Sequence, residues 1–359
     1  MKRFFAGIFL IIFLLVFCGK AFGATLLTDK VEIVKAKVEN ILNEEKEILP
    51  GTSVTGLKQT LQIQILEGSQ TGKTITIEND YIKLSEGEIF YLNHTTRAED
   101  GVDTYIVSDA YRLPALYFFA LLFILLVLLI GGMQGLRGLL SLAGSMLLIV
   151  FVLLPAVLAG YSPIFVAIGV SSLIIILGSY ITHGFNKTTT SAVLGMIFTV
   201  IITGILANFA VHFAKFTGMG SEEAVYLNFN LEGHIDILGV LLGGIMIGVL
   251  GVLYDVSIGQ AISVEELHKI APDIERKKIF ARAIRIGREH IGALVNTLAI
   301  AYVGAALPLL LLFFSSSSSV AEILNREIFS TEIIRILIGS IGLVLAVPIT
   351  TFISVLMLV

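Results

Sequence analysis

The chain has 359 residues, 56% of them hydrophobic and only 14% charged, and its mean hydropathy is +0.92. That balance excludes an ordinary soluble globular protein, and several apolar runs exceed the ~18 residues that cross a bilayer. A net charge of −4 without a basic patch argues against nucleic acid as a partner. The single cysteine, Cys18, excludes an intramolecular disulfide and a cysteine metal cluster.

The first 24 residues have the pattern of a secretory signal. Lys2 and Arg3 precede an apolar stretch of about fifteen residues, and small residues follow at Ala21 and Gly23, where a signal peptidase would cleave. We predict a signal peptide over residues 1–24, with an uncleaved N-terminal anchor or a lipidated Cys18 as alternatives. All three send the following segment out of the cytoplasm.

Residues 25–112 alternate apolar and polar side chains in five short stretches, separated by Gly, Asn, Asp and Pro. This period of two indicates half-buried strands. Five strands in about 85 residues fit a small closed or nearly closed β-barrel, which we expect to be OB-like. We expect an extracytoplasmic structural or docking module, with ligand binding as the alternative.

From Leu113 onward the chain predicts a bundle of about seven transmembrane helices. We place the spans at about 114–132, 138–159, 162–182, 190–213, 236–256, 290–314 and 332–356. The connection 257–289 is rich in Lys and Arg, whereas 160–161 has none and 214–235 has only Lys215. By the positive-inside rule, the β-domain lies outside and the C-terminus in the cytoplasm.

Polar side chains within spans are costly and usually face a bundle interior, so each is a functional hypothesis. Asn208 and His212 fall in the fourth span, Asp255 ends the fifth, and Asn296 lies in the sixth. We interpret His212 as an interfacial residue. Asn208 could instead form a hydrogen bond with a neighbouring helix.

Helical spacing gathers these residues into two stripes. If the fifth helix continues past its span, Asp255, Gly259 and Glu266 share one face. The next helix repeats the same offsets at Arg285, Glu289, Gly292 and Asn296. Arg288 lies beside this stripe. Buried carboxylates need a cationic or hydrogen-bonding partner. We therefore predict that Asp255 and Glu266 pair with the two arginines across a vestibule open to the cytoplasm. The alternative is a set of interfacial charges solvated by lipid headgroups.

Four glycines of the fifth span form two small-xxx-small pairs, Gly239/Gly243 and Gly244/Gly248. Such pairs let helix backbones approach closely, so we expect this helix in the bundle core. The sequence has no GxxxxGK[ST], HExxH or GxSxG motif. We expect no enzymatic activity, no cofactor and no metal centre.

Five segments together resemble the YibE/F-like membrane proteins of bacteria: GLRGLLSLAGSMLLIVFVLLPAVLAGYSP (135–163), THGFNKTTTSAVLG (182–195), TGMGSEEAVYLNFN (217–230), YDVSIGQAISVEEL (254–267) and RIGREHIGALVNTLAIAYVGAALPLLLL (285–312). The resemblance implies a multi-spanning protein of the bacterial plasma membrane. It places the family's motif residues at Asp255, Glu266, Arg288, Glu289, Asn296 and, in the GFN turn, Asn186.

Two functions are compatible with these patterns. The first is a permease or ion-coupled transporter, in which Asp255 and its partners bind an ion or small solute during alternating access. The second is a non-transporting membrane scaffold, sensor or assembly factor. In that case the outer β-domain or the connection 257–289 would bind a partner protein.

Overall fold

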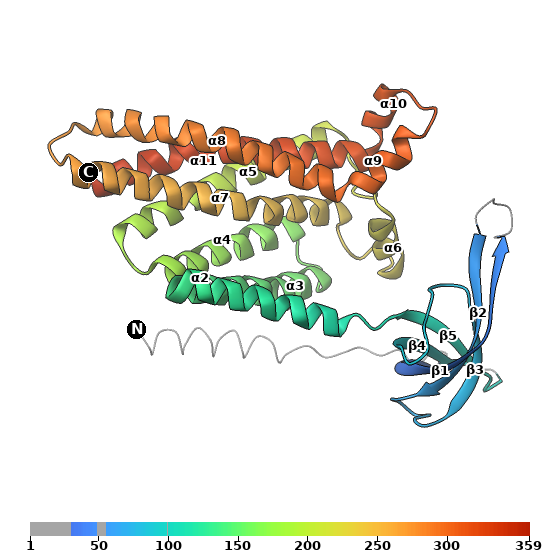
Figure 1. Cartoon of the computed structure of the whole chain (residues 1–359). Helices are drawn as coiled ribbons and strands as arrows, with labels where there is room; N and C mark the ends of the chain where they lie inside the picture. The colour runs from blue at the N-terminus through green and yellow to red at the C-terminus, as the bar shows by residue number, and fades with distance from the viewer. Residues whose placement is uncertain (1–29, 49–54, 99) are drawn as a thin grey trace. The chain divides into compact units, whose positions relative to one another are not determined.

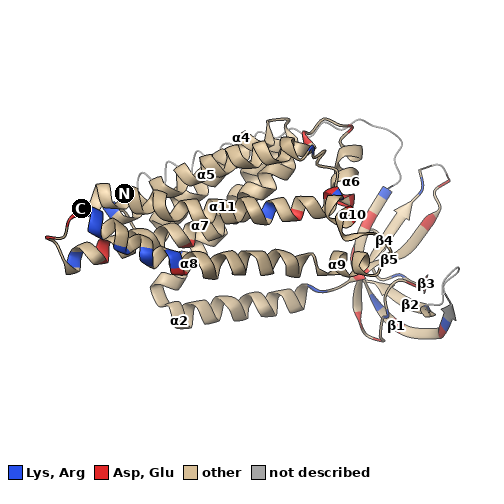
Figure 2. Ribbon diagram, turned by 90° about the horizontal axis from the view of Figure 1, so that it is seen from above, with Lys and Arg blue, Asp and Glu red and all other residues tan. Residues whose placement is uncertain are grey.

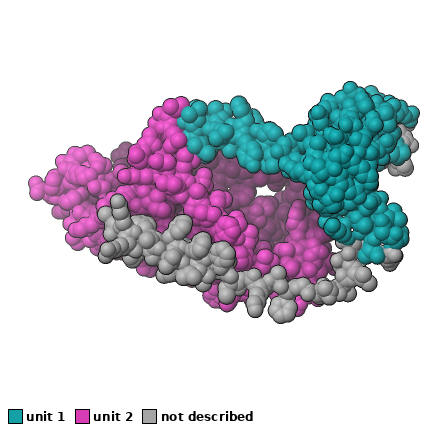
Figure 3. Space-filling model, turned by 90° about the horizontal axis from the view of Figure 1, so that it is seen from below, with its two compact units in different colours: residues 1–126 teal, residues 127–359 magenta. Residues whose placement is uncertain are grey.

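The computed structural model describes residues 30–48, 55–98 and 100–359, so the predicted signal segment lies outside the described residues. The chain divides into two compact units, Met1–Leu126 and Val127–Val359 (Figure 1, Figure 3). The first contains a β-sheet and the second a helical bundle. Helix α2 contributes residues to both.

Five antiparallel strands form one curled sheet in the order β3-β2-β1-β4-β5 (Figure 1). Their bounds are β1 (Lys30–Ile48), β2 (Thr55–Ile65), β3 (Thr74–Asn79), β4 (Ile89–Thr96) and β5 (Asp103–Ala110). The long β1 pairs with β4 along its first half and with β2 along its second half. Register shifts after Val38 and Ile41 bend the strand, which lets one strand serve both halves. The five predicted strands are confirmed as one sheet, but no ladder between β3 and β5 closes the described strands into a barrel.

Alternate residues of these strands build the core of the sheet. Each fully buried Val, Leu, Ile or Phe side chain contributes about 1.5–3 kcal/mol. The buried apolar residues are Val34, Ala36, Val38, Leu61, Ile63, Ile65, Ile77, Leu84, Phe90, Leu92 and Val107. The buried Gln59 amide accepts from Leu84 N (3.0 Å) and donates to its carbonyl (2.9 Å), so the core polar group is satisfied.

The helical part of the chain is built from long apolar helices and short connecting ones. The elements are α2 (Leu113–Leu148), η1 (Ile149–Leu153), α3 (Leu154–Leu158), α4 (Pro163–His183), α5 (Lys187–Phe213), α6 (Glu222–Asn230), α7 (Ile237–Ile270), α8 (Arg276–Ala305), α9 (Leu307–Phe314), α10 (Val320–Asn325) and α11 (Glu327–Leu358).

In the described part of the chain, five helical segments are long and apolar enough to span a membrane. The pair α8 and α9, bent by 65°, is a sixth candidate. One of the five, Leu113–Leu158, covers two predicted spans. Within it Gly132 has φ +53°, and a Cβ on Gly135 would collide with the Val127 carbonyl oxygen. In a straight helix, Val127 and Gly135 would be about 12 Å apart, because they are eight residues apart in sequence. Their close approach therefore shows that the chain reverses sharply at Gly132.

Helices α5, α7 and α11 pack against one another at the centre of the bundle, with α4 and α8 alongside (Figure 1). Gly287 of α8 lies where a Cβ would collide with Val347 of α11 and with the Gln260 amide of α7. The missing side chain of this glycine lets the three helices approach closely where they meet. The core shared by α5, α7 and α11 includes Ala192, Met196, Val249, Leu253, Leu343 and Ala346.

The two ends of the bundle differ in charge. Lys and Arg residues of the last turn of α7 and the start of α8 gather at the end that also holds the C-terminus (Figure 2). We call this the basic end; its residues are Lys269, Arg276, Lys277, Lys278 and Arg282. At the opposite end, the Glu327 carboxylate accepts from the backbone N–H groups of Thr217 (2.9 Å) and Gly218 (2.7 Å). That contact ties the α5–α6 connection to the start of α11.

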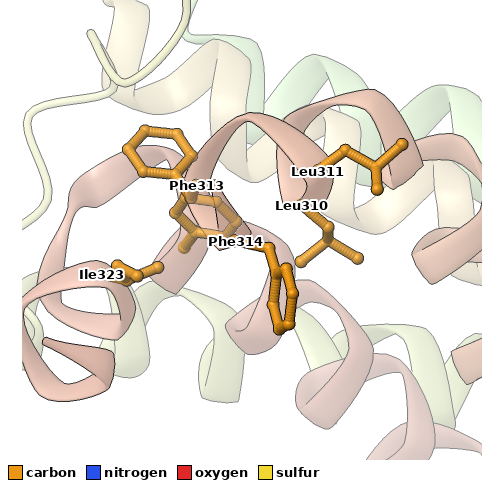
Figure 4. Close-up of a pocket in the computed structure, with 6 residues that line it drawn as sticks. Leu310, Leu311, Phe313, Phe314 and Ile323 are labelled. Carbon is orange, nitrogen blue, oxygen red and sulfur yellow. The ribbon is translucent and has the colours of Figure 1, made fainter. Parts of the chain in front are cut away.

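Figure 4 shows an apolar pocket of about 290 Å³ formed by residues of α9, α10 and α11. Its lining residues are Leu310, Leu311, Phe313, Phe314, Ile323 and Phe329. The rings of Phe313 and Phe329 meet edge to face with centroids 4.6 Å apart. This pocket offers no polar side chain to orient a ligand.

Candidate functional site

A polar pocket of about 320 Å³ lies between the α4–α5 turn and α7. Its lining residues are His183, Asn186, Thr188, Thr189, Ile258, Ala261, Ile262 and Glu265. Glu265 precedes Lys269 of the basic end by one helical turn and forms an ion pair with it at 2.8 Å. The pocket is therefore close to the basic end of the bundle.

The α4–α5 turn is fixed by Asn186, which the sequence singled out as a candidate site residue. Its Oδ1 accepts from Thr189 N at 2.7 Å, and its Nδ2 donates to the His183 carbonyl at 3.1 Å. An N-terminal cap of this kind satisfies a backbone N–H that the first turn of a helix leaves free. Asn186 thus shapes the rim of the pocket and orients the first turn of α5.

Glu265 connects α7 to the first turn of α5. Its carboxylate accepts from the Thr188 hydroxyl at 2.7 Å, and the Thr188 side chain is buried. The neighbouring Glu266 pairs only with Lys269 in the described structure (2.9 Å), and its side chain is more exposed than that of Glu265, at 57% against 34%. The two adjacent glutamates therefore differ in role, and Glu265 is the one that faces the pocket.

From Thr188 a chain of hydrogen bonds continues into the core. The Ser191 hydroxyl donates to the Thr188 carbonyl at 2.8 Å and lies 2.9 Å from the Ser354 hydroxyl of α11. Because the Ser191 proton is used by the carbonyl, Ser354 donates to Ser191. Ser191 and Ser354 are fully buried.

A second group of buried polar side chains joins α7 to α11. Thr350 donates to Ser257 at 3.1 Å. Thr351 donates to the Val347 carbonyl at 2.6 Å, so its hydroxyl oxygen accepts from the Gln260 amide nitrogen at 2.9 Å. In that orientation Gln260 also accepts from Gly287 N at 3.3 Å, which connects α8 to the same network. We call these buried groups the polar seam: Ser191, Ser257, Gln260, Thr350, Thr351 and Ser354.

Small and hydroxyl residues extend the seam along α5, at Thr188, Ser191, Gly195, Thr199 and Thr203. A Cβ on Gly195 would collide with Thr350, and one on Gly342 of α11 would lie 2.7 Å from the Thr203 hydroxyl oxygen. From Thr188 to Thr203 this face is about 22 Å long at 1.5 Å per residue. It covers most of the ~30 Å thickness of a bilayer core.

The predicted ion pairs between α7 and α8 do not form in the described structure. Asp255 is exposed and has no hydrogen bond or ion pair there, and no carboxylate pairs with Arg285 or Arg288. The reason is the rotation of α8, which turns Ile279, Ala283, Gly287 and Leu298 toward the bundle. At about 100° per residue, Arg285, Glu289 and Asn296 lie some 160–180° from Gly287 and face outward.

The other candidate residues are dispersed. Asn208 is exposed, and its carbonyl lies 2.8 Å from His212 Nδ1. Next to the unpaired Asp255, the Tyr254 hydroxyl donates to the Gly178 carbonyl of α4 at 3.4 Å. Among the four glycines of α7, an added Cβ would meet Pro163 of α4 at Gly239 and Ala167 of α4 at Gly243. At Gly248 it would collide with the Tyr302 hydroxyl of α8, whereas at Gly244 it would meet no described atom within 4 Å.

The small and hydroxyl residues of α5 were not predicted as site residues, although their spacing in the sequence indicates a common helix face. Thr188, Ser191, Gly195, Thr199 and Thr203 recur every three or four residues in an otherwise apolar span. That is the signature of a polar helix face turned to a neighbouring helix. Gly287 lies within the segment 285–312 that resembles the family, but the sequence alone does not predict which helix a single glycine contacts.

The β-sheet unit holds a separate polar cluster around the buried His94. His94 Nε2 lies 2.8 Å from Asp103 Oδ1, and its ring stacks on Tyr105 with centroids 4.9 Å apart. Gln70, in the β2–β3 turn, donates to the same carboxylate at 2.9 Å. Hydrogen bonds from His94, Thr96 and Gln70 hold the pKa of the Asp103 carboxyl well below its usual range.

A family model described as YibE/F-like protein matches residues 119–359, more than half of the chain. The chain belongs to the YibE/F-like family. This confirms the family predicted from the five sequence segments, and the YibE/F-like match includes every helix that lines the pocket and the polar seam. Comparison with curated proteins and with solved structures finds no match.

Proposed function

We propose that this YibE/F-like protein is a non-enzymatic permease or ion-coupled transporter whose path runs from the polar pocket into the polar seam. The observation that supports this most strongly is the hydrogen-bonded series Glu265, Thr188, Ser191 and Ser354. It links a pocket carboxylate to buried hydroxyls of the bundle core. An ion or small solute that leaves water at the pocket meets oxygen ligands at each step.

The energetics of polar groups in membranes favour this proposal. Glycine and alanine pack helices closely without polar atoms, whereas each buried hydroxyl needs a partner in a medium that has no water. Helices α5, α7 and α11 nevertheless place six hydroxyl or amide side chains in their common core. Polar groups inside a membrane bundle characteristically mark substrate and ion pathways.

A proline lies beside the seam. Pro348 lies inside α11, two residues before Thr350, and has no backbone N–H to complete the helical ladder. Broken or weakened helices beside the binding site are a recurrent feature of secondary transporters. We propose that α11 bends at Pro348 when the seam opens.

We propose a topology of seven spans in the plasma membrane. The two arms of α2 that meet at Gly132 count as separate spans, and α8 with α9 counts as one bent span. The concentration of Lys and Arg at the basic end supports a cytoplasmic C-terminus, with an OB-like β-domain that the preceding signal segment directs outside. The polar pocket then opens toward the cytoplasm.

A second candidate function, a membrane scaffold or sensor, is favoured by one feature of the β-domain. Ile33 of β1 and Ile106 of β5 both align with Asn93 of β4, and they are 62% and 59% exposed. Val31 adds a third exposed apolar side chain on β1, at 58%. Exposed apolar groups clustered on one sheet face suit a protein partner.

Flux measurements separate the two candidates. Purified protein in liposomes would be tested with H⁺, Na⁺, K⁺ and a panel of small solutes, against liposomes without protein. Transport predicts flux of at least one of these above the protein-free rate. No flux for any of them, together with a co-purifying protein that is lost when residues 25–112 are deleted, would favour the scaffold.

A further inference from the structure

The outward face of α8 has charged and polar side chains that lipid tails cannot solvate. This helix packs on α7 and α11 through Ile279, Ala283, Gly287 and Leu298, so its opposite face points away from these two helices. The exposed residues on that face include Arg285, Glu289, Gly292 and Asn296. An asparagine amide in hydrocarbon has donors and acceptors that lipid tails cannot satisfy.

The same face has the spacing of a helix–helix contact. Residues 285, 289, 292, 296, 299 and 303 follow one another at intervals of four and three, which is the a/d pattern of a coiled coil. At Gly292 a Cβ would meet no described atom within 4 Å, so a second helix backbone can approach there. Ala299 and Val303 continue the stripe with small and apolar side chains toward the α9 end.

We propose that this stripe joins the α8 helices of two copies of the chain in a parallel homodimer. Copies inserted with the same orientation are related by a two-fold axis along the membrane normal, which places identical residues at the same depth. A carboxamide both donates and accepts, so Asn296 can pair with Asn296 of the second copy. This self-complementary face therefore fits a second copy of the chain, and the dimer does not depend on transport.

The charges of the stripe are self-complementary as well. Arg285 and Glu289 lie one turn apart on the same face, about 6 Å along the helix. In the dimer, Arg285 of each copy lies within side-chain reach of Glu289 of the other, and both pairs form. Neither residue has an ion pair within the described single chain, so the dimer would provide the missing partners.

Cysteine cross-linking in native membranes tests the proposal. Cys18 is the chain's one cysteine, so a Cys18→Ser background permits single cysteines at Gly292 and Val303 on the stripe. Thr297 provides the control, because it is exposed on α8 but lies about 100° around the helix from Asn296. Under mild oxidation we expect covalent homodimers at both stripe positions, at least fivefold more than at Thr297.

Charge reversal distinguishes loss of the dimer from misfolding, because a second reversal should restore cross-linking only if the two charges pair. Arg285→Glu alone should reduce cross-linking through Gly292→Cys at least fivefold, and adding Glu289→Arg should restore it. Equal cross-linking at Thr297, no homodimer at either stripe position, or cross-linking to a different protein would overturn the proposal. So would loss of the dimer in the single reversal without recovery in the double reversal.

Discussion

The Thr188 hydroxyl donates to the Glu265 carboxylate over 2.7 Å and joins the first turn of α5 to α7, across 77 residues of sequence. This contact defines one wall of the polar pocket. The backbone carbonyl of the same Thr188 accepts from the Ser191 hydroxyl at the start of the polar seam. The shape of the pocket and the start of the seam are therefore coupled.

A double-mutant cycle measures this contact. Thr188→Val and Glu265→Gln should each lower stability, and their combined effect should fall short of additivity by roughly 1 kcal/mol. That magnitude lies below the ~1.5–3 kcal/mol typical of a hydrogen bond to a charged group, because Glu265 is partly exposed and because glutamine keeps an acceptor oxygen for Thr188. The measurement is thermal unfolding in detergent. A cycle of Thr188→Val with Glu266→Gln is the control and should be additive; equal coupling in both cycles would contradict the assignment.

Gly287 is predicted to be the contact point that positions α8. Gly287→Ala introduces a Cβ against Val347 and the Gln260 amide, and overpacking of this kind costs about 1–3 kcal/mol. Gly304→Ala on the same helix has nothing within 4 Å and should be neutral or slightly stabilising. Comparing the two unfolding temperatures in one detergent tests this. Indistinguishable values would show that α8 does not approach α7 and α11 at Gly287.

The β-domain should lose stability in acid through Asp103. A carboxyl with a lowered folded pKa stabilises the fold above its unfolded value of about 3.9 and loses that contribution as pH falls through the folded pKa. The unfolding temperature should therefore decrease below about pH 4. Because the chain has no tryptophan, Tyr91→Trp gives a fluorescence signal from this domain alone.

In that reporter background, Asp103→Asn should reduce the acid dependence. Asp80→Asn should not, since the exposed Asp80 has no hydrogen bond or ion pair among the described residues. Part of the slope should survive in Asp103→Asn, because a hydrogen bond from Ser69 also lowers the pKa of Glu32. An unchanged slope in Asp103→Asn would be inconsistent with the proposed role of the cluster.

At the opposite end of the bundle, Glu327 should control the mobility of the α5–α6 connection. Glu327→Ala removes the acceptor for Thr217 N, Gly218 N and the Thr217 hydroxyl. We expect amide hydrogen exchange at residues 217–219 to accelerate roughly tenfold, which corresponds to about 1.4 kcal/mol. Glu322→Ala, which removes only an exposed pair with Arg326, is the control and should leave these amides unchanged.

Much of the architecture was readable from sequence because it follows from periodicity. Alternation predicted the five strands, apolar runs predicted the helices, and the quoted motifs predicted the family. The orientation of α8 was not readable. Spacing correctly grouped Arg285, Glu289 and Asn296 on one face, but it cannot say which neighbour that face meets. The contact of Gly287 with Val347 and Gln260 decides the rotation, and it involves residues distant in sequence.

The sequence predicted only part of the candidate site, again because contacts between distant residues decide which side chains meet. Asp255 was predicted as a site residue because it is a charge at the end of an apolar run, yet it is exposed and unpaired in the described structure. The groups that meet in the pocket and seam are mostly Thr and Ser, which are common in membrane helices for packing alone. Only the juxtaposition of α5, α7 and α11 distinguishes Thr188 and Ser191 from packing residues.

The central claim is that solute passes through the pocket and the seam, and ion flux through matched glutamate variants tests it most directly. In liposomes, Glu265→Gln should reduce the flux found for the wild type at least tenfold, because Glu265 faces the pocket. Glu266→Gln, one residue away but outside the pocket lining, should retain the wild-type rate within about twofold. Equal rates in the two variants, or no flux in the wild type for any ion or solute tested, would contradict the account.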